Sequence, residues 1–304
     1  TQAVDTPPAL RFPKSPPLTL DRPRLMGVLN VTPDSFSDGG RFAGVADAVE
    51  HARRLVREGA SVLDVGGEST RPGAARVPVE EQIARVVPVV AAVRAMLDAE
   101  ALPGVISVDT TRAAVAEAAL DAGAELLNDV SGGLESEQER RGGMAALAAA
   151  RNVPLVLMHM RGKPADMQAD PRYLDVVAEV AAFLDERAAA AEASGVPSGQ
   201  VVVDPGIGFG KTLEHNLALL AGLGDLVGRQ AQAGRHVLLG ASRKSMFAKL
   251  DPTMAEPGDR LPGTLATTAW AVGAGCRLIR VHDVLENAQV CRVVLAICRE
   301  QIEK

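Results

Sequence analysis

The chain has 304 residues and a mass of 31.7 kDa, and its apolar fraction of 47% is enough for a large hydrophobic core. A formal net charge of -6 argues against a nucleic-acid partner, because phosphate backbones are bound by clustered lysines and arginines. The sequence has no apolar run of the ~18 residues that a membrane helix needs, and no charged-then-apolar leader. We therefore expect a cytoplasmic protein, with no membrane partner, that acts on small molecules.

The cysteines are Cys276, Cys291 and Cys298, which form no CxxC pair and have no histidine at metal-ligand spacing. We expect reduced thiols there, and no structural zinc site.

The first 24 residues are rich in proline, which rules out a helix in this segment. The prolines are Pro7, Pro8, Pro13, Pro16, Pro17 and Pro23. We expect residues 1–24 to form an extended or partly disordered arm, and residues 25–304 to form one catalytic domain.

From residue 25 onward, short apolar runs alternate with longer amphipathic segments, which is the pattern of βα units. The expected strands are 25–30, 61–67, 104–109, 126–130, 153–159, 201–206, 236–242 and 277–283, and the expected helices include 46–58, 79–100, 112–122, 174–194 and 265–274. Eight buried parallel strands predict a (β/α)8 TIM barrel. An open doubly wound sheet would show fewer strands and commonly a glycine-rich nucleotide loop after the first.

Polar side chains stand at or near the end of every predicted strand. They are Asn30, Asp64, Asp109, Asn128, His159, Asp204, Ser242 and His282. In a (β/α)8 barrel these ends converge on one mouth, where active sites are built. Any one of these residues could instead cap the following helix, but the set together predicts a site.

Two loops at this mouth have the composition of ligand-binding segments. Residues 30–40 follow the first strand and are rich in hydroxyl groups and glycine, as in a lid that includes Asp34. Residues 66–73 offer Thr70 as a hydrogen-bond donor and Arg71 as a positive fork for a carboxylate or phosphate.

Asp109, Asn128 and Asp204 are expected to project into one cavity from three different strands. Such groups can read the amino and ring N–H donors of a flat heterocycle such as a pterin. The residue types also allow a carboxylate metal cluster or a general acid–base pair. The glycine-rich segment 204–211 lacks the Walker spacing, and its more natural role is to let the backbone and Phe209 approach a ring.

The last two strands bring positive charge to the side of a barrel that commonly holds phosphate. Arg280 and His282 share a strand face by the two-residue period, and Lys244 follows the seventh strand. Lys244 could also act as a Schiff-base nucleophile. Arg243 is interpreted as a surface charge at the start of a helix.

Several segments in chain order resemble the dihydropteroate synthases, from about residue 25 to the C-terminus. They are NVTPDSFSDGG at 30–40, DVGGESTRPG at 64–73, SVDT at 107–110, LNDVSGG at 127–133, DPGIGFGKTLEHN at 204–216, SRKS at 242–245 and RVHDV at 280–284. The resemblance implies a transferase of folate biosynthesis that joins 6-hydroxymethyl-7,8-dihydropterin pyrophosphate to p-aminobenzoate, giving 7,8-dihydropteroate and pyrophosphate. It also implies a dissociative mechanism, a Mg2+ ion and a homodimer.

The resemblance assigns roles to individual residues. The pterin would be bound by Asp109, Asn128, Asp204 and Lys244, in a pocket shaped by Met158, Phe209 and Gly240. The pyrophosphate would be held by Asn30, Arg280 and His282, with Asn30 acting through Mg2+. The side that takes p-aminobenzoate, and sulfonamides as its mimics, would be formed by Phe36, Thr70, Arg71, Pro72 and Ser242. Asp109, Lys244, Arg280 and His282 would carry the catalysis.

Two other functions fit a pterin-binding barrel. A pterin-dependent methyltransferase shares the barrel and the pterin-binding acids, but segments 30–40 and 242–245 argue against it. A barrel that binds pterin or phosphate without turnover would not require the loop for a second substrate. The residues that argue against it are Asn30, Arg71, Lys244, Arg280 and His282. Ala241 and the pair Thr111–Arg112 depart from the common family pattern, and neither position has an assigned ligand role.

Overall fold

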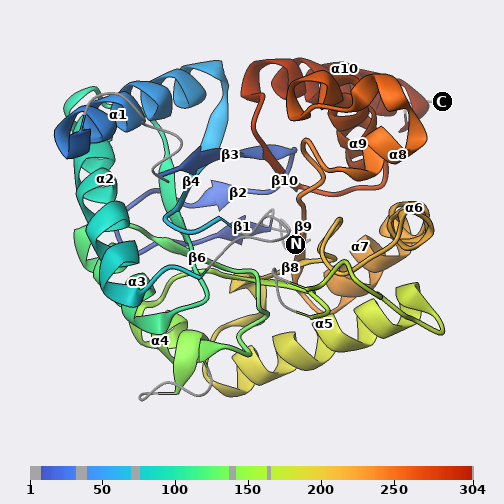
Figure 1. The fold of residues 1–304 in the computed structure, drawn as a ribbon, viewed down its shortest axis with the longest axis horizontal. Helices are drawn as coiled ribbons and strands as arrows, with labels where there is room; N and C mark the ends of the chain where they lie inside the picture. The colour runs from blue at the N-terminus through green and yellow to red at the C-terminus, as the bar shows by residue number, and fades with distance from the viewer. Residues whose placement is uncertain (1–7, 32–39, 70–75, 137–141, 163–165, 303–304) are drawn as a thin grey trace, which may run out of the picture.

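The computed structural model describes residues 8–31, 40–69, 76–136, 142–162 and 166–302. Within these residues, parallel strands close into a barrel in the order β10, β3, β4, β5, β6, β7, β8, β9, surrounded by helices (Figure 1). The strands are β3 (Arg24–Asn30), β4 (Ala60–Gly66), β5 (Val105–Asp109), β6 (Leu126–Asp129), β7 (Leu155–Met158), β8 (Val201–Asp204), β9 (His236–Leu239) and β10 (Leu278–Val281). The (β/α)8 TIM barrel predicted from the sequence is therefore confirmed.

The helices lie outside the barrel and cover its strands. They are α1 (Gly40–Glu58), α2 (Val79–Ala99), α3 (Ala113–Ala122), α4 (Gly143–Arg151), α5 (Val176–Ala193), α6 (Leu213–Ala221), α7 (Leu223–Gln232), α8 (Met246–Leu250), α9 (Leu261–Gly273) and α10 (Val284–Ile302), with 3-10 turns η3 (Ser198–Gln200), η4 (Pro252–Met254) and η5 (Pro257–Arg260). All the helices named from the sequence are present. Helix α1 starts at Gly40, before the predicted residue 46. The sequence pattern missed this start because Gly40 and Gly44 are poor helix formers. In the described residues, none of the helices is both long enough and apolar enough to cross a membrane.

The barrel interior begins with a buried apolar layer to which every barrel strand contributes one side chain. The layer consists of Met26, Val62, Val105, Leu126, Val156, Val202, Leu238 and Leu278. A larger apolar core fills the space between the outer faces of the strands and the helices. Because side chains alternate between the two faces of a strand, this inner layer fixes which residues further along each strand also point inward.

The N-terminal arm closes the end of the barrel below this layer. Its strands β1 (Ala9–Leu10) and β2 (Leu18–Thr19) pair in antiparallel fashion and cross the barrel in Figure 1. Leu10 and Leu20 are buried against the inner layer, and Glu125 accepts hydrogen bonds from the backbone N–H groups of Lys14, at 2.7 Å, and Ser15, at 3.1 Å. The described part of the arm contains two short strands and is packed against the barrel. Residues 1–7 lie outside the described part of the chain.

Candidate active site

Further along each strand, the next inward-facing positions are mostly polar. Two positions beyond the apolar layer, the inward-facing residues are Val28, Asp64, Ser107, Asn128, Met158, Asp204, Gly240 and Arg280. Two positions further, β3, β4 and β5 end in Asn30, Gly66 and Asp109. The strand register places Asn30 opposite Gly66, Gly66 opposite Asp109, and Asp109 opposite Asn128. Residues far apart in the sequence therefore meet at one mouth.

Arg280 stands at the centre of a buried charge network. Its Nε donates to Asp64 Oδ2 at 2.6 Å, and its Nη2 donates to Asp109 Oδ2 at 2.8 Å. Asn128 Nδ2 donates to the same Asp64 oxygen at 3.0 Å. Asp64 is fully buried, and its sequence position predicts a strand end but no particular role. Its signal was its place on the same strand face as Val62 and Gly66.

Burial and neighbouring charges shift the pKa values of this network. Burial is the largest influence on Asp109, and together with the nearby carboxylate of Asp64 it outweighs Arg280 and raises the pKa of Asp109 to about 7. Burial alone would lower the pKa of Arg280, but the carboxylates of Asp64 and Asp109 raise it. Arg280 is thus a permanent cation shared by two carboxylates.

Lys244 lies over the ring of Phe209, with its Nζ 3.8 Å from the ring centroid. Burial, followed by repulsion from Arg280, lowers the pKa of Lys244 to about 7, against the opposing attraction of Asp204 and Asp109. The ammonium group therefore faces an aromatic surface and two carboxylates. This arrangement can hold a flat, polar ring beside Phe209 and the inward-facing carboxylates.

Asp204 and Gly240 shape the space beside that ring. Asp204 Oδ1 accepts from the backbone N–H of Gly206 at 2.7 Å, and burial raises the pKa of Asp204. A Cβ atom at Gly240 would lie 3.2 Å from Asp204 Oδ2, so any larger residue would crowd this carboxylate. Val130, Met158, Met167 and Phe209 form a buried apolar cluster beside these groups.

The loop after β8 is built around Lys211, which the sequence analysis missed. Lys211 is buried, and its Nζ contacts His159 Nδ1 at 2.9 Å and donates to the carbonyl oxygens of Gly206 at 2.9 Å and Phe209 at 3.0 Å. Gly206 has φ of +68°, and a Cβ there would lie 1.9 Å from the His159 carbonyl oxygen. His159, grouped with the site from its strand-end position, therefore holds this loop. The sequence signal for Lys211 was its position as the lysine that ends the glycine-rich segment 204–211.

His282 differs from its expected role as a positive charge. Burial, followed by the charges of Arg280 and Arg243, lowers the pKa of His282 to about 3, so the ring is neutral near pH 7. Its Nδ1 lies 2.9 Å from Ser242 Oγ, and its backbone N–H donates to the same oxygen at 3.2 Å. When the hydroxyl donates to Nδ1 of the neutral ring, the ring proton lies on Nε2, where it can serve as a hydrogen-bond donor.

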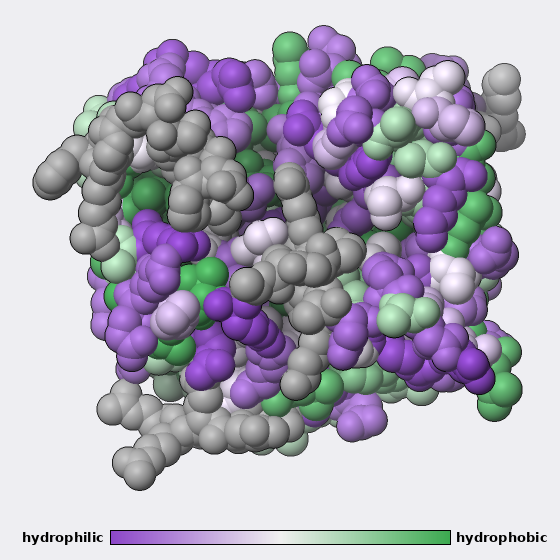
Figure 2. All heavy atoms as spheres, in the orientation of Figure 1, coloured by the Kyte–Doolittle hydropathy of each residue, from purple (hydrophilic) through white to green (hydrophobic). Residues whose placement is uncertain are grey.

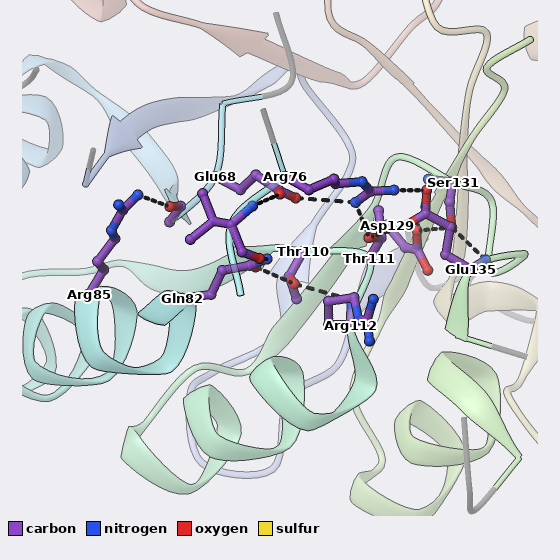
Figure 3. Close-up of polar contacts among 12 residues, drawn as sticks. Glu68, Arg76, Gln82, Arg85, Thr110, Thr111, Arg112, Asp129, Ser131 and Glu135 are labelled. Carbon is purple, nitrogen blue, oxygen red and sulfur yellow. Dashed lines mark hydrogen bonds and ion pairs between the residues drawn. The ribbon is translucent and has the colours of Figure 1, made fainter. Parts of the chain in front are cut away.

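A second polar network lies at the rim, where the loops after β4, β5 and β6 meet (Figure 3). Arg76 donates to Glu68 Oε2 and to Thr111 Oγ1, each at 3.3 Å, and also pairs with Glu135. Glu68 accepts from the backbone N–H of Val77 at 2.7 Å, which joins the two ends of its own loop. The sequence analysis assigned none of these residues. The predicted site residues Phe36, Thr70, Arg71 and Pro72, and also Asp34, lie outside the described residues.

Comparison with known proteins shows what this barrel is related to. The sequence profile of the family described as "Pterin binding enzyme" matches residues 26–282. A dihydropteroate synthase of Escherichia coli is 43% identical over 285 residues, covering 94% of this chain and 95% of that protein. The chain belongs to the dihydropteroate synthases, within the pterin-binding enzyme family.

Other relatives agree with this membership of the dihydropteroate synthases. A probable bifunctional folylpolyglutamate synthase/dihydropteroate synthase of Haloferax volcanii is 47% identical over 91% of this chain, which spans only 31% of that protein. A solved structure of the Xanthomonas albilineans dihydropteroate synthase with 4-aminobenzoic acid superposes with a TM-score of 0.84 at 43% identity, covering 96% of this chain and 98% of that one.

Proposed function

We propose that this chain condenses 6-hydroxymethyl-7,8-dihydropterin pyrophosphate with p-aminobenzoate to form 7,8-dihydropteroate and pyrophosphate. The observation that carries the proposal is the buried Asp64–Arg280–Asp109 network at the barrel mouth, with Lys244 beside it. The reaction develops a cation on one substrate and an anion on its leaving group. This site holds carboxylates and a permanent cation within one cavity, so it can stabilise both.

The pterin is recognised by acceptors and by an aromatic surface. Asp109, Asn128 and Asp204 face inward from β5, β6 and β8 and can accept the N–H donors of the pterin ring. Phe209 and Lys244 together cover one face of the pterin ring, since Lys244 Nζ already lies 3.8 Å from the centroid of the Phe209 ring. Gly240 leaves room for the ring beside Asp204.

The pyrophosphate is held at the ends of β3 and β10. Arg280 supplies a fixed positive charge, and neutral His282 supplies an Nε2–H donor. Asn30 ends β3 at the same rim and remains partly exposed. These groups attract the leaving group as its charge develops.

A Mg2+ ion fits this side of the site as a partner of the substrate. In the described residues, no group of three or more His, Cys, Asp or Glu side chains could hold a metal ion. Mg2+ commonly keeps several waters and is bound through few protein oxygens together with phosphates, so the amide oxygen of Asn30 is a sufficient protein ligand. When bound, the ion neutralises charge on the departing pyrophosphate.

The chemistry is dissociative and needs no covalent bond to the enzyme. The bond between the pterin methylene carbon and the pyrophosphate oxygen breaks, and its electron pair leaves with pyrophosphate. The amine of p-aminobenzoate then attacks the methylene cation and loses a proton. The ionised carboxylate of Asp109 favours the cation, and Arg280 balances that carboxylate before the substrate binds. Lys244 acts as a binding residue in this scheme.

The p-aminobenzoate side includes Ser242, which is buried and lies on His282, together with Phe36, Thr70, Arg71 and Pro72. Sulfonamides, as mimics of p-aminobenzoate, are expected to compete for the same side. A relative, the Xanthomonas albilineans dihydropteroate synthase, has been solved with 4-aminobenzoic acid, which supports p-aminobenzoate as the second substrate.

The decisive experiment incubates the purified chain with Mg2+ and both substrates, and follows pyrophosphate and dihydropteroate together. We expect equal amounts of the two products, competition between a sulfonamide and p-aminobenzoate, and loss of activity without Mg2+. Lys244→Ala should lose most of the activity, whereas Lys249→Ala, an exposed lysine on α8, should not. Pterin binding without either product would overturn the proposal and favour the alternative of a pterin-dependent methyltransferase, which passes a methyl group to a corrinoid protein.

A homodimer is proposed through the outer face of α6, α8 and α9. Leu217, Leu250 and Trp270 are 40%, 51% and 56% exposed and line an apolar cavity of about 640 Å³. Hydrophobic residues reach the surface in this part of the molecule (Figure 2). Exposed apolar patches of this kind mark interaction surfaces. Light scattering should give twice the mass of the chain, and Trp270→Asp should give the monomer; a monomeric parent protein would contradict the proposal.

A further inference from the structure

Arg243 has a backbone conformation that its side chain makes unfavourable. Among the described residues other than glycine, only Ala101, Asn152 and Arg243 have positive φ angles. Ala101 and Asn152 follow the ends of α2 and α4, where the left-handed conformation is a common helix ending. Arg243 has φ of +56° in the short loop between β9 and α8, where no helix end explains it.

Contacts with three other segments, the end of β10, η5 and α9, hold Arg243 in this conformation. Its Nε donates to Asp283 Oδ2 at 3.0 Å and its Nη2 also pairs with Asp283, so the guanidinium grips both carboxylate oxygens. Its backbone N–H donates to Thr264 Oγ1 at 3.0 Å, and its carbonyl oxygen accepts from Arg260 Nη1 at 3.1 Å. Arg243 is therefore not the solvated surface charge that the sequence suggested.

The partners of Arg243 are themselves held in place. Asn287 Nδ2 on α10 donates to the Asp283 carbonyl oxygen at 2.6 Å, and Thr268 Oγ1 on α9 donates to Asn287 Oδ1 at 2.6 Å. Thr264, Thr268 and Asn287 are all buried. The Asp283 carboxylate that accepts the hydrogen bonds of Arg243 thus belongs to a well-packed junction between β10, α9 and α10.

The residues on either side of Arg243 belong to the site. Ser242 contacts His282, and Lys244 lies on Phe209 and near the carboxylates. Asp283 is the neighbour of His282 in the sequence. The loop after β9 and the end of β10 are therefore joined by two contacts, Ser242 with His282 and Arg243 with Asp283. A left-handed residue between Ser242 and Lys244 sets the direction in which each of them points.

We propose that Arg243 is a positioning residue, whose left-handed backbone, held by Asp283 and α9, orients Lys244 toward the pterin and Ser242 toward His282. This inference rests on the proposed function, because Lys244 and Ser242 take their substrate roles from it. Arg243 itself touches no reacting atom in this scheme. A misplacement of catalytic groups by about 1 Å can lower activity by about a hundredfold, so a loosened loop has a measurable effect.

The test compares glycine and alanine at residue 243, because glycine accepts a positive φ and alanine resists it. We expect kcat/KM to fall about tenfold or more in Arg243→Ala, and Arg243→Gly to keep several times more activity than Arg243→Ala. Asp283→Asn should lower kcat/KM in the same direction. The matched control is Asn152→Gly against Asn152→Ala, which presents the same backbone difference away from the site and should change the melting temperature without changing kcat/KM.

Binding of 6-hydroxymethylpterin, followed by its fluorescence, separates this inference from the proposed function. If the parent chain makes no dihydropteroate, the proposed function fails, but pterin affinity should still fall in the order parent, Arg243→Gly, Arg243→Ala. Equal pterin affinity and equal kcat/KM in all three folded proteins would overturn the inference. Equal losses in the glycine and alanine variants would also overturn it, because the effect would then come from the guanidinium alone.

Discussion

Single side chains in this molecule owe their properties to burial as much as to their chemistry. His282 sits between Arg280 and Arg243 and is neutral near pH 7, although its ordinary pKa of 6.5 would make it partly charged at the surface. Asp109, in contrast, has a pKa raised to about 7. Burial therefore favours the uncharged forms of both His282 and Asp109, but Asp109, with a pKa of about 7, remains partly ionised near pH 7 and can pair with Arg280.

The neutral ring of His282 predicts a dependence of stability on pH. The pKa of His282 in the folded protein, about 3, lies below the ordinary 6.5, so the unfolded chain binds an extra proton between these values. Stability is therefore lost as the pH falls below about 6.5, by up to about 1.4 kcal/mol per pH unit from this group. In His282→Asn this contribution should vanish.

Urea unfolding at several pH values between 4 and 7 measures this effect. Asp109 and Asp129, whose pKa values are raised, act in the opposite direction, but they do so in both proteins and their effect cancels in the comparison. Parallel pH curves for His282→Asn and its parent would show that the ring is protonated in the folded state.

Asp64 acts in the site through the two side chains that donate hydrogen bonds to it. It accepts hydrogen bonds from both Arg280 and Asn128, so Asp64→Asn should disturb the position of the arginine that holds pyrophosphate and of the amide that binds the pterin. We expect kcat/KM for the pterin substrate to fall about tenfold or more, with a smaller change in KM for p-aminobenzoate. Asp185→Asn, which weakens a surface pair between α5 and α7, is the matched control. Unchanged kinetics in Asp64→Asn would remove this residue from the site.

At the scale of elements, the loop after β8 depends on one buried cation. Lys211 donates to backbone oxygens of its own loop and contacts His159 at the end of β7, and burial lowers its pKa to about 7. Glycines at 206, 208 and 210 allow the backbone to wrap closely around this ammonium group. The loop thereby presents Phe209 to the pocket.

Replacement of Lys211 by methionine should therefore destabilise the whole protein. It leaves buried carbonyl oxygens without donors, each of which costs about 1–3 kcal/mol, and we expect a total loss of about 3 kcal/mol or more in the free energy of unfolding. Lys249→Met, at the exposed end of α8, should change it by less than about 0.5 kcal/mol. Denaturant unfolding of both variants checks this, and equal stabilities would mean that water replaces the lysine.

The whole molecule is closed at one end by its arm and open at the other to substrate. Leu10 and Leu20 cover the apolar layer at the N-terminal end of the barrel, as Figure 1 shows for β1 and β2. Burial of these side chains keeps water from the layer that supports Asp64, Asn128 and Asp204. The described part of the arm, residues 8–24, therefore contributes to the stability of the barrel from the end opposite the site.

Truncation of Leu10 tests this contribution. Leu10 is fully buried, so Leu10→Ala should lower the free energy of unfolding by about 2–5 kcal/mol. Leu174→Ala, at a fully exposed leucine, should have almost no effect. Thermal melting followed by circular dichroism distinguishes the two, and an unchanged melting temperature in Leu10→Ala would show that the arm is dispensable.

The sequence by itself determined the strand order, the (β/α)8 barrel and the polar strand ends at its mouth, because a two-residue period and buried parallel strands leave their pattern in neighbouring residues. Its family motifs also determined the family. Only the tertiary structure decided that Arg280 bridges Asp64 and Asp109, that Lys211 and His159 support a loop, that His282 is neutral, and that Asp283 holds Arg243 in a left-handed conformation. These properties depend on burial and on contacts between residues up to 216 positions apart, which no local pattern records.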